Sequence, residues 1–287
     1  MDYKIISNYQ KDKALRDSFN ELSKKVFGLD FENWYQSGFW TDKYIPYSIL
    51  INNRIVSNVS VNLCNFDFNG KEVRLIQLGT IMTDPEFRRK GLARTLLSKI
   101  LEEYEGKVDG IYLFGNDSVL DFYPKFGFVS QKEYQYSKNV EIKNEKFIQE
   151  FPLKDEKFLG KMVDIVKNKT QPSSFYMTKN TDLYMFYLSQ FMKDYIYYLK
   201  EEDTYVIAEV IDKTLCIHAV FGETSLDRVI QSFGSEIKKV VLCFTPTDSS
   251  GYKIEELKEE DTTLFVRGKF FQNIKNACFM FPTLSHA

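Results

Sequence analysis

Residues 81–94 read Ile-Met-Thr-Asp-Pro-Glu-Phe-Arg-Arg-Lys-Gly-Leu-Ala-Arg. A β-branched strand ends at Asp84-Pro85, and an amphipathic helix begins near Gly91. The turn between them combines three basic residues with the unpaired amides and the positive end of a helix. Gly91 and Ala93 let a bulky anion approach the main chain closely. The stretch therefore predicts an anion-binding turn, and a solvated basic turn before a surface helix is the alternative.

The segments around this turn alternate between strands and helices. The periodicities predict successive antiparallel strands, followed by a strand–helix–strand–helix order, and therefore a mixed sheet with helices on both faces. The expected strands are 3–7, 47–51, 55–63, 73–83 and 111–114, and the expected helices are 15–26, 91–104 and 118–126.

Composition narrows the class of protein. The formal net charge of −2 gives no broad attraction to nucleic acid or to an anionic membrane. No apolar run approaches the roughly 20 residues of a membrane span, and the N-terminus lacks the order of a signal peptide. The 4 cysteines are far apart and the chain has 2 histidines, so we expect reduced thiols and no metal site. These features predict a cytoplasmic protein without a nucleic-acid or membrane partner.

A second segment, residues 116–128, reads Asn-Asp-Ser-Val-Leu-Asp-Phe-Tyr-Pro-Lys-Phe-Gly-Phe. Together the two segments resemble the GCN5-related N-acetyltransferase (GNAT) superfamily, in its bacterial tandem-domain type with a degenerate second domain. Arg88-x-x-Gly91-x-Ala93 resembles the coenzyme-A-binding signature. In the second motif Asn116, Val119, Tyr123 and Gly127-Phe128 fall in the register of the superfamily, although Val119 is larger than the usual Ala. The resemblance covers roughly residues 1–140.

The resemblance implies an acetyl-CoA-dependent N-acetyltransferase that moves an acetyl group to a primary amine by direct attack in a ternary complex. The strand over 81–83 would face the pantetheine arm and splay from the strand over 111–114, and the amides of the turn would hold the pyrophosphate. The cofactor-binding residues so implied are Ile81, Met82, Thr83, Arg88, Arg89, Lys90, Gly91, Leu92, Ala93, Arg94 and Asn116.

Tyr123 would be the general acid that protonates the departing thiolate, with Asn116 binding near the pantetheine or a bound water. A phenol has a pKa of about 10 and a thiol of about 8.5, so this transfer is uphill by only about 2 kcal/mol. The alternative for Tyr123 is a core aromatic residue beside Phe122 and Phe126.

The general base is less clearly marked. Many relatives place a Glu on the long strand, where residues 74–83 offer only Gln77 and Thr80. A water chain, His286 or the carboxylate of Ala287 stay open as the base. The last residues, 281–287, are apolar, and some multi-domain members insert a terminal carboxylate into the active site. We expect this tail to reach the cleft of the first half; a final strand packed into the second half is the alternative.

An aromatic cluster occupies the region that borders the acceptor site in relatives. Its members, which we predict to bind the substrate, are Phe31, Trp34, Tyr35 and Trp40. The cluster either lines a pocket for an apolar or cationic amine or forms the interface with the second half.

The second half lacks the anion-binding turn. Its comparable segment, Phe221–Ser225, is shorter, acidic and without the Arg-x-x-Gly-x-Ala pattern, so we expect one active site per chain. The predicted architecture is α/β (mixed α+β), with two tandem acyl-CoA N-acyltransferase-like domains, each a mostly antiparallel twisted sheet flanked by helices. Residues 1–140 would form the catalytic domain, 141–155 a linker, and 156–287 a degenerate GNAT-like domain. His218 would be a core histidine.

Two other functions stay open. A tandem-GNAT aminoacyl or peptidyl transferase would need a broad basic face, which the composition does not offer. A non-catalytic acyl-CoA-binding sensor would not need an acid such as Tyr123. We expect a small-molecule or peptide amine as the acceptor, and the chain is compatible with a monomer or a homodimer.

Overall fold

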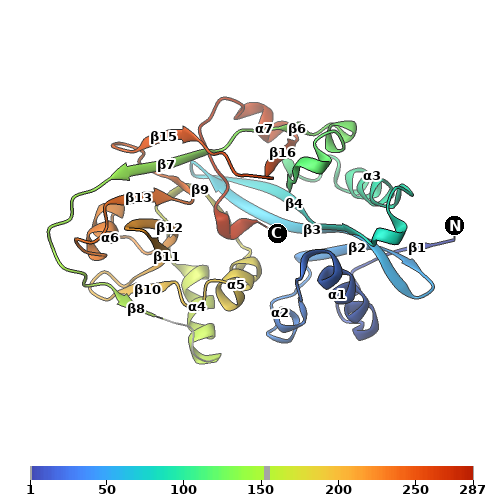
Figure 1. Ribbon diagram of the computed structural model, residues 1–287, viewed down its shortest axis with the longest axis horizontal. Coiled ribbons are helices and arrows are strands. Elements are labelled where there is room, and N and C mark those ends of the chain that lie inside the picture. The colour runs from blue at the N-terminus through green and yellow to red at the C-terminus, as the bar shows by residue number, and fades with distance from the viewer. Residues whose placement is uncertain (1, 152–155, 287) are drawn as a thin grey trace.

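The computed structural model describes residues 2–151 and 156–286, which form two twisted sheets with the C-terminal segment between them (Figure 1). Across the first sheet the order is β1 (Lys4–Ser7), β2 (Tyr44–Ile51), β3 (Arg54–Phe68), β4 (Lys71–Thr83), β5 (Gly110–Gly115), β16 (Thr263–Arg267) and β6 (Val129–Ser130). β9 (Ser173–Thr178) pairs with the far end of β3, and β14 (Thr245–Pro246) pairs with β9. Only β4 and β5 run parallel among the pairs described in this sheet.

The second sheet has the order β15 (Lys253–Glu256), β7 (Tyr134–Asn139), β13 (Lys239–Leu242), β12 (Thr214–Phe221), β11 (Thr204–Ile211), β10 (Ile196–Leu199) and β8 (Gln149–Glu150). Its parallel pair is β12 and β13. The predicted class, a mixed α/β fold with mostly antiparallel sheets flanked by helices, is confirmed.

Helices cover both faces of the first sheet. Phe19 and Leu22 of α1 pack in one apolar cluster with Met82 of β4, whereas Leu96 of α3 packs in another with Leu78. The helices are α1 (Lys13–Phe27), α2 (Glu32–Gln36), α3 (Leu92–Tyr104), α4 (Glu156–Asn168), α5 (Thr181–Gln190), α6 (Leu226–Ser232) and α7 (Lys269–Asn273), with 3₁₀ helices η1 (Pro85–Phe87), η2 (Asp117–Val119), η3 (Tyr123–Phe126) and η4 (Thr283–Ser285).

Local sequence explains the ends of several elements. The Asp12 carboxylate accepts a hydrogen bond from the Leu15 amide and so caps α1, which ends at Gly28 with φ +72°. Asn52 and Asn53, both with positive φ, form the tight turn of the predicted hairpin between β2 and β3. The helix predicted over 118–126 is instead two short 3₁₀ helices, because Pro124 has no amide hydrogen to donate inside an α-helix.

Each sheet contains one or more strands from the other half of the sequence, and one such strand in each sheet lies between two others. In the first sheet β16 lies between β5 and β6, with Phe265 opposite both Leu113 and Ser130. In the second sheet β7 lies between β13 and β15. Strand pairing therefore crosses the expected linker, 141–155, in both directions, and the boundary between residues 1–140 and 156–287 stays a prediction.

The C-terminal segment runs between the two sheets and is bonded to both (Figure 1). On the side of the second sheet the Tyr136 hydroxyl donates to the Cys278 carbonyl (2.6 Å), and Thr283 Oγ1 lies 2.9 Å from His218 Nδ1. On the side of the first sheet the Tyr112 hydroxyl donates to the Ser285 carbonyl (3.2 Å). The alternative of a final strand at 278–281 is wrong, since these residues form no strand.

The second half repeats the order of the first around its own parallel pair: β11, β12, α6 and β13 correspond to β3, β4, α3 and β5. A Cβ atom at Gly222 would lie 2.1 Å from Thr204 Oγ1, so the Thr204 side chain fills the space after β12. At Gly91 nothing lies within 4 Å of that position. A Cβ atom would therefore meet no neighbour at Gly91 and would clash at Gly222. That the chain has one active site and that its second half is a degenerate domain both stay predictions.

Candidate active site

A cleft opens between the parallel strands β4 and β5. Their pairing stops at Gln77 and Tyr112, although β4 continues to Thr83 and β5 to Gly115. The two strands part as predicted, and a cavity of about 400 Å³ lies between them. Its lining residues are Phe27, Leu78, Gly79, Thr80, Ile81, Met82, Thr83, Ala93, Phe114, Gly115, Asn116, Val119, Phe122 and Tyr123. The three residues of β4 predicted to face the pantetheine arm are among them.

A bulge in β4 shapes the wall of this cleft. Ser60 pairs with Gly79 and Asn58 with Met82, so Thr80 and Ile81 lie opposite a single residue of β3. Thr80 has φ +45°, an uncommon conformation for a residue with a branched side chain. Two side chains hold it there: Asn58 Nδ2 donates to the Thr80 carbonyl (2.9 Å), and the Tyr44 hydroxyl lies 2.5 Å from Thr80 Oγ1. The bulge turns the main chain of β4 toward the cavity.

The basic turn lines a second cavity, of about 330 Å³, at the N-terminus of α3. Its lining residues are Thr83, Phe87, Arg88, Arg89, Gly91, Leu92, Ala93, Arg94 and Phe122. Gly91, with φ +80°, precedes the helix and no side chain caps it, so the amides of the first turn remain free to bind an anion. Thr83, Ala93 and Phe122 also line the cleft, so the two cavities adjoin.

Lys90 is the one member of the predicted turn that points elsewhere. Its ammonium group donates to the Glu86 carbonyl (2.9 Å) and lies 4.7 Å from the centre of the Phe87 ring. The side chain therefore braces the turn from outside the cavity that the other predicted residues line.

Asp84 anchors the start of the turn. Its fully buried carboxylate accepts hydrogen bonds from Lys25 (3.0 Å), from Arg54 (2.6 Å) and from the Glu86 amide (3.1 Å). Burial alone would raise the pKa of Asp84, but the amide and the two cations outweigh it and hold the pKa below its ordinary value. An ionised Asp84 thus ties the turn to α1 and to β3.

Tyr123 lies at the end of the cleft, on η3. Its ring packs on Phe265 of β16 (centroids 5.2 Å apart) and on Phe128 (6.1 Å). No described residue hydrogen-bonds to its hydroxyl, and burial raises its pKa to about 12, so the phenol is protonated at neutral pH. Asn116, at the end of β5, is exposed at the rim, where its Oδ1 accepts from the Ser118 hydroxyl (2.6 Å). The structure thus brings both predicted residues of the second motif to the cleft.

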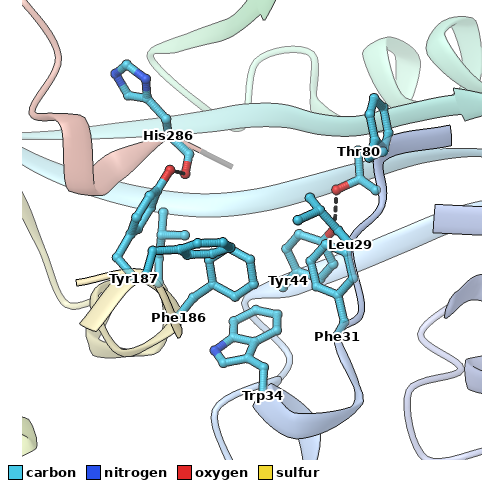
Figure 2. Close-up of a pocket in the computed structure, with 11 residues that line it drawn as sticks. Leu29, Phe31, Trp34, Tyr44, Thr80, Phe186, Tyr187 and His286 are labelled. Atoms are coloured by element: carbon cyan, nitrogen blue, oxygen red, sulfur yellow. Dashed lines mark hydrogen bonds between the residues drawn. The ribbon is translucent and has the colours of Figure 1, made fainter. Parts of the chain in front are cut away.

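An apolar cavity of about 350 Å³ lies between the two halves of the chain and shares Phe27 and Thr80 with the cleft. Figure 2 shows its walls, which come from α2, β2 and β4 on one side and from α5 and the C-terminal segment on the other. The lining residues are Phe27, Leu29, Phe31, Trp34, Tyr44, Thr80, Leu183, Phe186, Tyr187, Phe191 and His286.

Two of the four predicted substrate-binding aromatics line this cavity, and two do not. Phe31 stacks on Phe186 (centroids 5.5 Å apart), and the Trp34 indole donates to the Asp182 carbonyl (3.0 Å), so these two also form the contact between the halves. Trp40 is buried behind them and donates to the Tyr44 carbonyl (3.1 Å), while Tyr35 carries the Arg16 guanidinium on its ring. The sequence left open whether the aromatic cluster lines a substrate pocket or forms the interface between the halves; Phe31 and Trp34 do both.

The C-terminal segment reaches this cavity. The Tyr187 hydroxyl donates to the His286 carbonyl (2.5 Å), and the His286 ring stacks on Phe114 of the cleft (3.9 Å). His286 Nε2 is buried without a partner among the described residues, and burial lowers the pKa of the ring to about 4, so it is neutral at pH 7. Ala287 lies outside the described residues.

Sequence reasoning missed the half of the cavity that α5 contributes. Residues 183–188 of α5 are nearly all buried around the whole circumference of the helix. That pattern, with Phe186 and Tyr187 adjacent, is typical of a helix packed between two bodies. In the sequence this wall is marked only by the apolar and aromatic run of residues 183–188.

Comparisons with known proteins agree with this geometry. Residues 10–130 match the family model described as the acetyltransferase (GNAT) domain. No curated protein matches the chain significantly.

Among the described residues no group of three or more His, Cys, Asp or Glu side chains could hold a metal ion, and no helix is long and apolar enough to cross a membrane.

Several solved structures share the fold over nearly the whole chain. A conserved protein of unknown function from Enterococcus faecalis V583, described as a probable N-acyltransferase, is 15% identical with a TM-score of 0.62, over 94% of this chain and 73% of that one. GCN5-related N-acetyltransferases from Kribbella flavida (14% identity, TM-score 0.60, 93% and 71%) and Anabaena variabilis (15%, 0.54, 93% and 72%) are also similar. At these identities the likeness is one of fold.

Proposed function

We propose that this chain, whose residues 10–130 match the family model of the acetyltransferase (GNAT) domain, transfers an acetyl group from acetyl-CoA to a primary amine. One observation carries the proposal: the cleft and the apolar cavity meet at Thr80 and Phe27. The cleft continues into the basic turn, and the apolar cavity lies between the two halves of the chain. An acyl donor and an acceptor can therefore reach the same segment of β4 at the same time.

The residues present fit coenzyme A. The free amides at the start of α3, with Arg88, Arg89 and Arg94, suit a pyrophosphate. The pantetheine arm would then lie along Ile81–Thr83, where β4 has lost β5 as a neighbour and offers main-chain groups. Asp84, held ionised by two cations, keeps this segment in place without turning its charge toward the phosphates.

The reaction follows from the order of these parts. The amine attacks the thioester carbonyl, a C–N bond forms, and the oxyanion is stabilised by main-chain amides of β4 near its bulge. As the C–S bond breaks, the thiolate takes the proton of the Tyr123 hydroxyl. Burial raises the pKa of Tyr123, but the same desolvated cleft also raises the pKa of the leaving thiol, so the two groups stay comparable as acids.

The amine must lose a proton before or during attack. Burial lowers the pKa of His286, which makes its ring a weak base. A water chain from Gln77 and Thr80 and the carboxylate of Ala287 stay as the other candidates. Deletion of the last three residues should lower kcat sharply and leave acetyl-CoA binding intact if the tail supplies the base; unchanged turnover would exclude the tail.

Release of free thiol from acetyl-CoA with a panel of amines tests the function. We expect Tyr123→Phe to lower kcat by about 10²-fold or more, with little change in the Kd of coenzyme A, because the phenol acts only on the leaving group. Tyr252→Phe, which removes a buried hydroxyl of the second half, is the matched control and should be active.

Three outcomes would contradict the proposal. Binding of acetyl-CoA without thiol release for any amine would indicate a sensor. No binding of acetyl-CoA would indicate a transferase with another donor. Full activity of Tyr123→Phe would remove the role of Tyr123 as the acid.

A further inference from the structure

The apolar cavity between the two halves holds no charged side chain. Of its eleven lining residues seven are Phe, Trp or Tyr, and none carries a carboxylate, an ammonium or a guanidinium group. The His286 ring is neutral at pH 7 because burial lowers its pKa, and Figure 2 shows this ring directed away from the aromatic group. A ligand in this cavity meets ring faces and no fixed charge.

The polar groups of the cavity are already paired with one another. The Tyr44 hydroxyl and Thr80 Oγ1 lie 2.5 Å apart, and the Tyr187 hydroxyl is bonded to the His286 carbonyl (Figure 2). A polar or polycationic ligand placed here would lose its water of hydration and gain no matching partners, which makes its binding unfavourable for each charge left unpaired. A flat apolar body would lose little.

The cavity has its own opening to solvent. Phe27, at the end of α1, and Phe191, just after α5, are each 48% exposed although both line it. The basic turn leads into α3, whose side chains pack against the other face of the first sheet. A ligand can therefore enter past Phe191, which does not line the cleft, while a donor occupies the cleft.

We infer that the acceptor is a primary amine on a short linker to an aromatic body, with a single positive charge. This inference rests on the proposed acetyl transfer, because it assigns the acceptor to the cavity that meets the cleft at Thr80. The aromatic body lies among Phe31, Trp34 and Phe186, and the linker carries the amine toward Thr80. The volume of about 350 Å³ suits one or two fused rings.

The apolar character of the cavity also affects how the acceptor amine loses its proton. An ammonium group moved from water into an apolar cavity loses solvation, so its pKa falls and the neutral amine becomes more abundant. One ammonium at the junction with the cleft can lose its proton in this way. A polyamine would bring further charges that stay ionised and stay unpaired.

The test compares tryptamine with spermidine, by initial rates of thiol release from acetyl-CoA and by calorimetry on the protein saturated with coenzyme A. We expect kcat/KM for tryptamine to exceed that for spermidine by at least about tenfold. Phe191→Glu should lower kcat/KM for tryptamine and raise it for spermidine, because it adds a carboxylate at the half-exposed rim of the cavity. The ratio of the two kcat/KM values should shift by about fivefold. Val210→Glu, at a similarly exposed position of β11 outside the cavity, should leave the ratio unchanged.

Each outcome decides. Equal or better use of spermidine by the wild-type protein, or the same ratio in Phe191→Glu and Val210→Glu, overturns the inference. So does a preference for octanoyl-CoA over acetyl-CoA together with competition between the octanoyl chain and tryptamine, since the cavity would then hold the acyl chain. If tryptamine binds in a Phe191-dependent way without any thiol release, the proposed transfer fails and only the assignment of an aromatic amine to this cavity stands. If thiol is released with polyamines alone, the proposed transfer stands and the inference is overturned.

Discussion

At the scale of single residues, Gly115 determines where the Tyr123 ring can lie. A Cβ atom at Gly115 would be 3.0 Å from Cε2 of Tyr123 and 3.2 Å from Cγ2 of Val119. Those distances are shorter than ordinary contacts, so a methyl group there would force the Tyr123 ring and the Val119 side chain to shift by a few tenths of an ångström. Tyr123 could be found from the sequence because its motif is local, but this constraint could not, because it depends on how η3 folds back on β5.

We therefore expect Gly115→Ala to lower kcat by about tenfold or more while the Kd of coenzyme A stays within about twofold. Steady-state kinetics and calorimetry on the same preparation measure both. Gly160→Ala in α4, where nothing lies within 4 Å of the new methyl group, is the control. An unchanged kcat in Gly115→Ala would mean that the ring position does not limit the reaction.

Glu133 gives a pH dependence to stability. Its buried side chain accepts a hydrogen bond from the Phe281 amide (2.7 Å), and burial, with a smaller contribution from Glu259, raises its pKa to about 8. In the unfolded chain a Glu has a pKa of about 4.3, so the folded state binds more protons between the two values. The free energy of unfolding should therefore fall as pH rises through this range, by up to about 1.4 kcal/mol per unit.

Replacement by Gln keeps the acceptor for the Phe281 amide and removes the titration. We expect the melting temperature of the wild-type protein to fall between pH 6 and pH 9 and that of Glu133→Gln to change much less. Glu102→Gln, on the exposed side of α3, should follow the wild type. Parallel curves for wild type and Glu133→Gln would show that the carboxyl is already ionised when folded.

At the scale of elements, the turn into α3 and the bulge of β4 define the site. The turn could be predicted because its residues are adjacent in sequence and Gly91 has a clear backbone role. The bulge could not, because residues 76–82 still read as a regular apolar strand. Only pairing with β3 shows that Leu78 and Met82, four positions apart, face opposite sides of the sheet.

The turn offers a test with a built-in control. Arg88→Ala should raise the Kd of coenzyme A by about tenfold and make binding less sensitive to salt, since its guanidinium lines the cavity at the start of α3. Lys90→Ala should have little effect, because its ammonium is held by the Glu86 carbonyl outside that cavity. Calorimetry at two salt concentrations checks both; an equal loss for Lys90→Ala would place the pyrophosphate on the other side of the turn.

At the scale of the whole molecule, the exchange of β7 and β16 joins the two sheets into one structure. The sequence predicted two similar halves but not this exchange, because β7 and β16 are short strands of ordinary composition and nothing local specifies a distant partner. The predicted tail illustrates the same limit: its apolar character indicated burial, whereas its path along both sheets depends on contacts such as Phe281 with Tyr112, stacked at 4.0 Å.

We expect a fragment of residues 1–140 to show no cooperative unfolding transition and no binding of coenzyme A. Without β16 the edge of β5 is unpaired and Tyr123 loses its contact with Phe265. The complete chain should unfold in a single calorimetric transition. A sharp transition in the fragment would show that the first sheet is stable without the exchanged strand.

The position of β16 also has a consequence for synthesis. When β5 leaves the ribosome, the strand that must cover it has not yet been made, and most of the second half is translated first. The edge of β5 therefore stays unpaired during most of translation, and the Tyr123 ring lacks its contact with Phe265. The candidate site, although its motifs are encoded early, can be completed only near the end of translation, and we expect folding to be slow because this pairing joins segments that are far apart in the sequence.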